Sequence, residues 1–248
     1  MTALSRFSAA SRMEWIKLRS LRSTWWTLAV TVAGATGIAV AVGAATEHGS
    51  GDLTNNALAG IAPGLLLIGV LGVLTMTSEY SSGMIRATLA AVPNRPLMLA
   101  AKAAVFGLVT LALGVATAFL AFTAGRATLS SGIRPPSLGD PGVLRAVLLS
   151  GVGVCLIGLF GLGLGAIIRH SAAALAVYVG AVFVVGQLLL ALAPSTVRWV
   201  PLAIVSDSLA VSRPSAADLS PWTGLAVLCL YTTATLATGA WLLAHRDA

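Results

Sequence analysis

The chain has 248 residues, of which 57% are hydrophobic and 9% are charged, and its mean hydropathy is +0.93. A soluble domain carries about 25% charged residues, so this chain cannot cover a water-facing surface and belongs in a bilayer. Its net charge of +7 does not indicate a nucleic-acid partner, because no nucleic-acid-binding motif is present and membrane proteins concentrate Lys and Arg on the cytoplasmic side.

Residues 1–24 precede the first apolar run and predict an amphipathic helix on the membrane surface. Arg12 and Arg19 lie on its polar side, and we expect them near the anionic headgroups of the inner leaflet. Trp25 and Trp26 mark the interface where the first span begins. The apolar stripe comprises Phe7, Ala10, Leu18 and Leu21.

Glu14 is an acidic residue within that apolar stripe, and two explanations are open. In the first, Glu14 pairs with Lys17, three residues along the helix. In the second, Glu14 meets a basic group of residues 77–102, such as Arg86, or a basic group of a partner.

Six apolar runs have the length of about 20 residues that is needed to cross a bilayer. Backbone groups in lipid must bond to one another, so we expect each run to be a helix and the fold to be an all-α polytopic membrane protein. The transmembrane domain is then 25–248, with an outer loop at 193–222. The six runs are 25–45, 57–77, 103–123, 147–168, 172–192 and 223–243.

The connection at 78–102 is far longer than the short turn that joins neighbouring antiparallel helices. Its composition is helical from Glu79 to Val92, and Pro93 ends the run. On such a helix, Glu79, Gly83 and Arg86 share one side. The segment therefore predicts a short amphipathic helix, which either docks against a partner or only lies on the membrane.

Basic residues indicate the orientation. With the N-terminus in the cytoplasm, ten of the 15 Lys and Arg residues lie inside and five lie outside. This excess of inner positive charge is typical of membrane proteins. Six spans then place both termini in the cytoplasm.

Several kinds of chemistry have no support in the sequence. No span carries a charged residue near its middle, which disfavours an ion-coupled carrier or a channel. Gln187 is the most polar residue deep in a span, and we expect it to make an interhelical contact or to line the pathway. No metal-ligand spacing, nucleophile motif or GxxxxGK[ST] loop is present. We therefore expect a non-catalytic chain without a cofactor.

Two segments carry a resemblance to a known family. EWIKLRSLRSTWW (14–26) and SEYSSGMIRATLAAVPNRPLMLAAK (78–102) resemble the membrane subunits of type-2 ATP-binding-cassette exporters, especially the short permeases of high-GC bacteria. The resemblance implies a multi-pass protein of the bacterial cytoplasmic membrane. It also implies a homodimer or heterodimer of permease chains beside two ATPase subunits, which bind ATP and Mg.

In that family the N-terminal segment is an interface helix, and the loop after the second span is a coupling helix seated on the ATPase. The resemblance also implies a short re-entrant helix outside, at 199–209. The interface residues carried over are Glu14, Lys17 and Arg19. The coupling residues carried over are Glu79, Tyr80, Gly83, Met84 and Arg86.

The favoured hypothesis is a permease subunit that exports a lipophilic or amphipathic compound, because its spans are apolar with scattered Thr, Ser and Gln. Two alternatives stay open. One is a stand-alone carrier or channel, and the other is a non-transporting membrane scaffold or sensor subunit.

The orientation leads to a labelling prediction. A cysteine introduced at Ser50 should react with an impermeant thiol reagent added outside intact cells, and one at Ser82 should not. The opposite pattern would overturn the assigned orientation.

Overall fold

The computed structural model describes residues 3–46, 52–130, 134–208, 211 and 219–245. In these ranges the protein is all-α, without a strand, and six helices are long and apolar enough to span a bilayer. The predicted fold class is therefore confirmed. The spans are α2 (Arg22–Ala45), α4 (Ile61–Ser81), α6 (Arg95–Ala127), α7 (Val143–Ile168), α8–α9 (Ser171–Leu192) and α11 (Pro221–His245).

Each spanning helix begins one to eight residues away from its predicted start, because a hydropathy average does not register the residues that begin a helix. Helix α6 begins at Arg95, where predicted span three began at 103. The Asn94 side chain accepts a hydrogen bond from the Leu97 amide and caps this start. Helix α4 begins at Ile61, after a separate short helix, α3 (Leu53–Ala57), capped by the Asp52 carboxylate.

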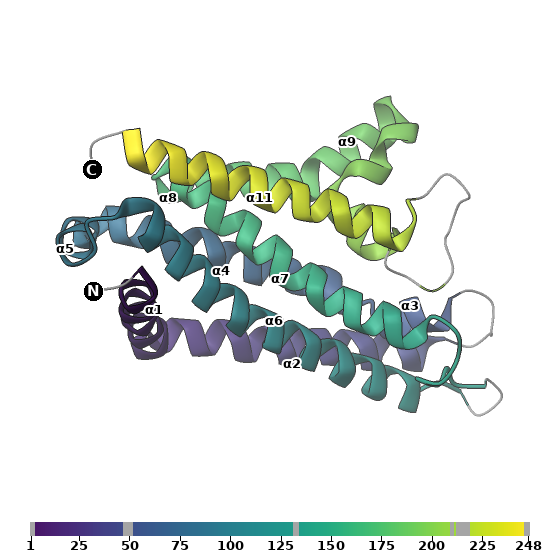
Figure 1. The fold of residues 1–248 in the computed structure, drawn as a ribbon. Coiled ribbons are helices and arrows are strands. Elements are labelled where there is room, and N and C mark those ends of the chain that lie inside the picture. The colour runs from purple at the N-terminus through teal and green to yellow at the C-terminus, as the bar shows by residue number, and fades with distance from the viewer. Residues whose placement is uncertain (1–2, 47–51, 131–133, 209–210, 212–218, 246–248) are drawn as a thin grey trace.

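Helix α7 is the centre of the bundle and packs against α4, α6 and α11 (Figure 1). Of its most apolar stretch 72% is buried, against 11% for the α8–α9 span. Helices α1 (Ala3–Ser20) and α5 (Met84–Ala91) run crosswise to the spans, at the same end of the bundle. We call this the α1/α5 end; the last turn of α11 also lies there.

Glycines allow the spans to approach closely. A Cβ atom on Gly161 of α7 would overlap the Gly69 carbonyl of α4, and one on Gly165 would lie 2.8 Å from the Val73 carbonyl oxygen. A Cβ atom on Gly60 would overlap the Ala35 carbonyl of α2. The two G-x-x-x-G matches, at 60–64 and 161–165, therefore contribute to packing within this chain.

The fifth span is interrupted by a π-helical segment, η1 (Gly180–Val184), which joins α8 (Ser171–Val179) to α9 (Val185–Leu192). The chain then forms only short turns: η2 (Pro194–Trp199), α10 (Pro201–Ala203) and η3 (Ile204–Ser208). These turns occupy the predicted re-entrant segment 199–209, whose last residue lies outside the described residues. Ile204 is fully buried, so the turns fold against the bundle.

The glycine contacts predict opposite effects for two Gly→Ala substitutions. Gly161→Ala should destabilise the chain by about 1–3 kcal/mol, because it forces α7 away from α4. Gly34→Ala, on a helix surface with nothing within 4 Å, should stabilise it by about 0.5–1 kcal/mol through helix propensity. Unfolding in mixed micelles titrated with SDS measures both, and equal effects would contradict the close α4–α7 contact.

Candidate functional site

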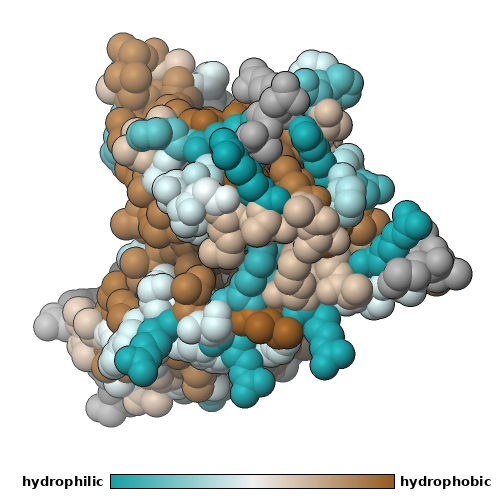
Figure 2. Space-filling model, turned by 90° about the vertical axis from the view of Figure 1, so that its left-hand side faces the viewer, coloured by the Kyte–Doolittle hydropathy of each residue, from teal (hydrophilic) through white to brown (hydrophobic). Residues whose placement is uncertain are grey.

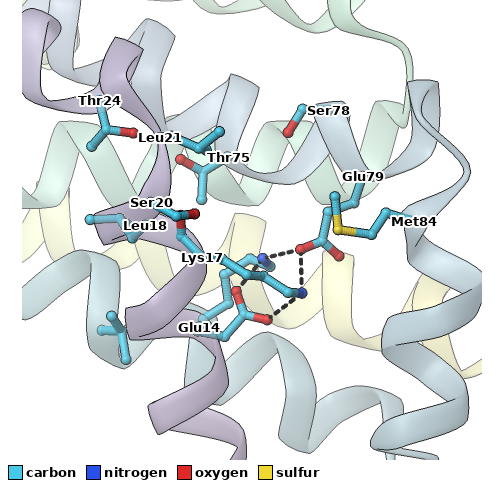
Figure 3. Close-up of a pocket in the computed structure, with 12 residues that line it drawn as sticks. Glu14, Lys17, Leu18, Ser20, Leu21, Thr24, Thr75, Ser78, Glu79 and Met84 are labelled. Atoms are coloured by element: carbon cyan, nitrogen blue, oxygen red, sulfur yellow. Dashed lines mark hydrogen bonds and ion pairs between the residues drawn. The ribbon is translucent and has the colours of Figure 1, made fainter.

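Four charged residues meet at the α1/α5 end: Glu14 and Lys17 of α1, Glu79 of α4 and Lys102 of α6 (Figure 3). We call them the ion cluster. The Lys102 ammonium donates to Glu14 at 2.5 Å and to Glu79 at 2.7 Å. The Lys17 ammonium donates to Glu79 at 2.9 Å and to Glu14 at 3.0 Å. Each lysine thus bridges both carboxylates.

Helix positions bring these side chains together. Glu14 lies in the apolar stripe of α1, which faces the bundle, and Lys17 is three residues further on the same helix. Glu79 lies in the last turn of α4, and Lys102 lies two turns into α6. Because α1 packs across α6, its buried face places Glu14 over the ends of both spans.

Burial makes the pairing necessary. Glu14 is 3% exposed and Lys102 is 2% exposed. A buried charge without a partner costs several kcal/mol, so charges of this kind persist only when paired and hydrogen-bonded. Two glutamates and two lysines cancel one another in net charge.

Lys17 also connects the cluster to α5. Its ammonium donates to the Thr88 hydroxyl at 2.9 Å, and Thr88 is buried on the inner side of α5. Burial lowers the pKa of Lys17, but hydrogen bonds and charges from Glu79 and Glu14 outweigh this effect. The pKa therefore lies above its usual value, and Lys17 stays charged at neutral pH.

The structure contains contacts that fit part of each of the two explanations for Glu14. The Glu14–Lys17 pair is present. Glu14 also meets a basic group of residues 77–102, but that group is Lys102 and not Arg86. Arg86 is exposed on α5.

The prediction of one helix from Glu79 to Val92 is wrong. Gly83 has a φ of 69°, in the left-handed region that glycine adopts without steric cost. Helix α4 therefore ends at Ser81, and α5 begins at Met84 as a separate eight-residue helix. Glu79 and Arg86 consequently do not share a helix face.

The structure separates the five predicted coupling residues into two groups. Glu79 is buried in the ion cluster, and Tyr80 is half-buried, with the Arg169 guanidinium 5.4 Å from its ring centroid. The exposed group comprises Gly83, Met84 and Arg86. Arg19 of the predicted interface helix is also exposed, as its polar side requires.

Two arginines that the sequence analysis did not single out hold the end of α11. Arg95 donates to the Leu243 carbonyl at 2.9 Å, and Arg169 donates to the Leu242 carbonyl at 3.0 Å. Cations at a helix C-terminus complete its unpaired carbonyls and suit its dipole. Their positive charge is visible in the sequence, but their partner lies at least 73 residues away and has no sequence signal.

Gln187 is exposed on α9, and within the described ranges its side-chain amide has no hydrogen-bond partner. The predicted interhelical contact is therefore not made inside this part of the chain. Among the described residues no group of His, Cys, Asp and Glu has a geometry that suits a metal ion.

No protein-family model matches this chain, and no curated protein matches it in sequence.

The cluster geometry predicts an asymmetry between single and double substitutions. Lys102→Met should destabilise the chain by about 3–5 kcal/mol, because it leaves two buried carboxylates with too little compensating positive charge. Glu14→Met combined with Lys102→Met should recover most of this loss, because the Lys17–Glu79 pair remains. SDS titration measures both, with the exposed Arg86→Met as a control that changes stability by no more than about 0.5 kcal/mol. A double variant no more stable than Lys102→Met would refute direct pairing.

Proposed function

We propose that this chain is the permease subunit of an ATP-binding-cassette exporter in a bacterial cytoplasmic membrane, driven by a separate ATPase that binds ATP and Mg. The observation that supports this most is α5: a short crosswise helix that connects two spans and has one buried side and one exposed side. Such a helix suits the transfer of motion from a soluble partner to the spans.

The buried side of α5 ties it to the bundle. Ile85 and Thr88 are each 3% exposed, and Thr88 bonds to Lys17. Through Lys17 and the ion cluster, a displacement of α5 acts on α1, α4 and α6 together. We propose that Glu79 holds α1, α4 and α6 together inside the protein and does not dock a partner at the surface.

The exposed side of α5 offers Met84 and Arg86 to a partner. Figure 2 views the α1/α5 end face-on, with hydrophilic residues distributed across it beside hydrophobic ones. Arg12, Arg19 and Arg86 are all exposed at this end. A surface of this kind suits a partner with acidic side chains around an apolar recess, and its cations favour the cytoplasmic side.

We further propose that a second permease copy or the cargo contacts the α8–α9 span. This span is the least buried of the six. Gln187 lies on it among exposed Val184, Val185 and Leu188. An amide left facing lipid without a partner is unfavourable, so a neighbouring helix or an amphipathic cargo would satisfy it.

The proposal predicts which surface holds the ATPase. Tagged protein solubilised from its native membranes should copurify with a protein whose sequence contains a GxxxxGK[ST] motif, identified by mass spectrometry. Arg86→Glu should reduce the copurified amount at least about tenfold, because a reversed charge in an interface costs several kcal/mol.

The matched control is Arg12→Glu, an exposed charge reversal at the same end but on α1, which should retain the partner. Recovery of the chain without any such ATPase, combined with transport that persists after ATP depletion, would favour the carrier alternative.

A further inference from the structure

A cavity with a polar lining lies at the end of the bundle opposite the α1/α5 end, where Figure 1 shows α3. Its volume is about 250 Å³, and it is bounded by α3, the start of α4, α7 and η3. The described residues that line it include four polar side chains and no charged one. The polar residues are Asn55, Asn56, Ser150 and Ser206.

Ser150 supplies a hydroxyl group inside the bundle. It lies about two turns, or roughly 10 Å, into α7, and it is 4% exposed. Thr75 and Thr110 of other spans donate to carbonyls of their own helices, whereas Ser150 makes no hydrogen bond in the described part of the chain. Its oxygen is not fully enclosed, unlike the unpaired hydroxyl of Thr117. The accessible part of the Ser150 hydroxyl therefore faces the cavity that this residue lines.

The other three polar side chains are accessible from the same cavity. Asn55, Asn56 and Ser206 are each partly exposed, and their side chains make no hydrogen bond to any described residue. A carboxamide has two N–H donors and one carbonyl acceptor, and a hydroxyl both donates and accepts. The cavity thus offers donors and acceptors side by side.

Backbone contacts hold these side chains in place. Asp52 caps α3 through the amides of Thr54 and Asn55, which fixes the short helix that carries both asparagines. Ser206 follows Ile204 and Val205, which are buried against the bundle. The polar groups are therefore positioned before any ligand arrives, which lowers the entropy that binding loses.

The size and the apolar wall of the cavity indicate the kind of molecule that fits. A single water needs about 10–15 Å³ of such volume, and the cavity holds more than ten times as much. Leu58 and Ile61 are buried and form part of its apolar wall. This combination matches a ring that carries polar groups at its edge and C–H groups on its faces.

We propose that this cavity binds an uncharged, hydroxyl-bearing ring of the size of a monosaccharide. A carboxamide donates from its nitrogen and accepts at its oxygen, so Asn55 and Asn56 can each bond to two adjacent hydroxyls of one ring. Ser150 bonds to a hydroxyl at the inner edge of the ring. The C–H faces of the ring pack against Leu58 and Ile61. This proposal does not rest on the exporter function.

The same chemistry disfavours other ligands. An ion would lose its hydration among groups that bear no opposite charge, which is costly. A single amide group would pair with one carboxamide but would leave the Ser150 hydroxyl unpaired. A ring with only one hydroxyl would leave most of the polar groups of the cavity without partners.

The test is a ligand-observed NMR titration of the purified full chain in a polyoxyethylene detergent, because a detergent with a sugar headgroup would compete for the cavity. Its probes are methyl glucoside, cyclohexanol, glucuronate, glucosamine and N-methylacetamide. Methyl glucoside should bind most tightly. The two charged sugars should bind at least about tenfold more weakly, since their charge is not compensated in the cavity.

Three variants locate the binding. Ser150→Ala removes one hydroxyl with little change in volume and should weaken methyl glucoside binding about three- to tenfold, as expected for one hydrogen bond. Ala62→Phe, at a residue that lines the cavity, should abolish binding by filling it. Ser195→Ala is the matched control: Ser195 is exposed on η2 and does not line the cavity, so this variant should bind methyl glucoside unchanged.

Three results would overturn the proposal. Failure of every probe to bind the unmodified chain would mean that water alone occupies the cavity. Binding of a charged sugar, cyclohexanol or the amide as tight as that of methyl glucoside would mean that the ligand class is wrong. Methyl glucoside binding that is unchanged in Ser150→Ala, or that persists in a folded Ala62→Phe variant, would place the sugar elsewhere.

Discussion

Buried Glu14, Glu79 and Lys102 meet the half-buried Lys17 where three helices come together, and this contact determines how the α1/α5 end is built. Any one of these charges alone would cost several kcal/mol to bury. Together they are neutral, and each lysine bonds to both carboxylates. Helix α1 therefore cannot lie freely on the membrane surface: it must fold across α6 to pair Glu14 with Lys102. Lys17 then links α1 to Glu79 of α4 and to Thr88 of α5.

The spans could be predicted because lipid imposes one requirement on every segment that crosses it. A run of apolar residues must close its own backbone hydrogen bonds, so length and hydropathy identify the helix. Boundaries depended on other atoms. Asn94 and Asp52 cap α6 and α3 with single side-chain oxygens, which a hydropathy average does not register. Which spans are neighbours depends on close contacts such as Gly161 with Gly69, and glycine is too frequent here to indicate a partner.

The ion cluster was partly visible in the sequence. Glu14 stood out because an acid in an apolar stripe needs a partner, and Lys17 lies within reach on the same helix. Lys102 could not be identified, since 88 residues separate it from Glu14 and several cations compete in the same loop. Gly83 was misread for a related reason: glycine is tolerated in a helix at a cost of up to about 1 kcal/mol, and only its left-handed φ shows that it separates α4 from α5.

The choice of ions over apolar side chains has a structural consequence. A well-packed apolar contact is often as stable as a buried ion pair, but it tolerates small rotations and shifts of the helices. Glu14 bonds to Lys102 on α6 and, through Lys17, is linked to Glu79 on α4, so α1 is held in both rotation and position.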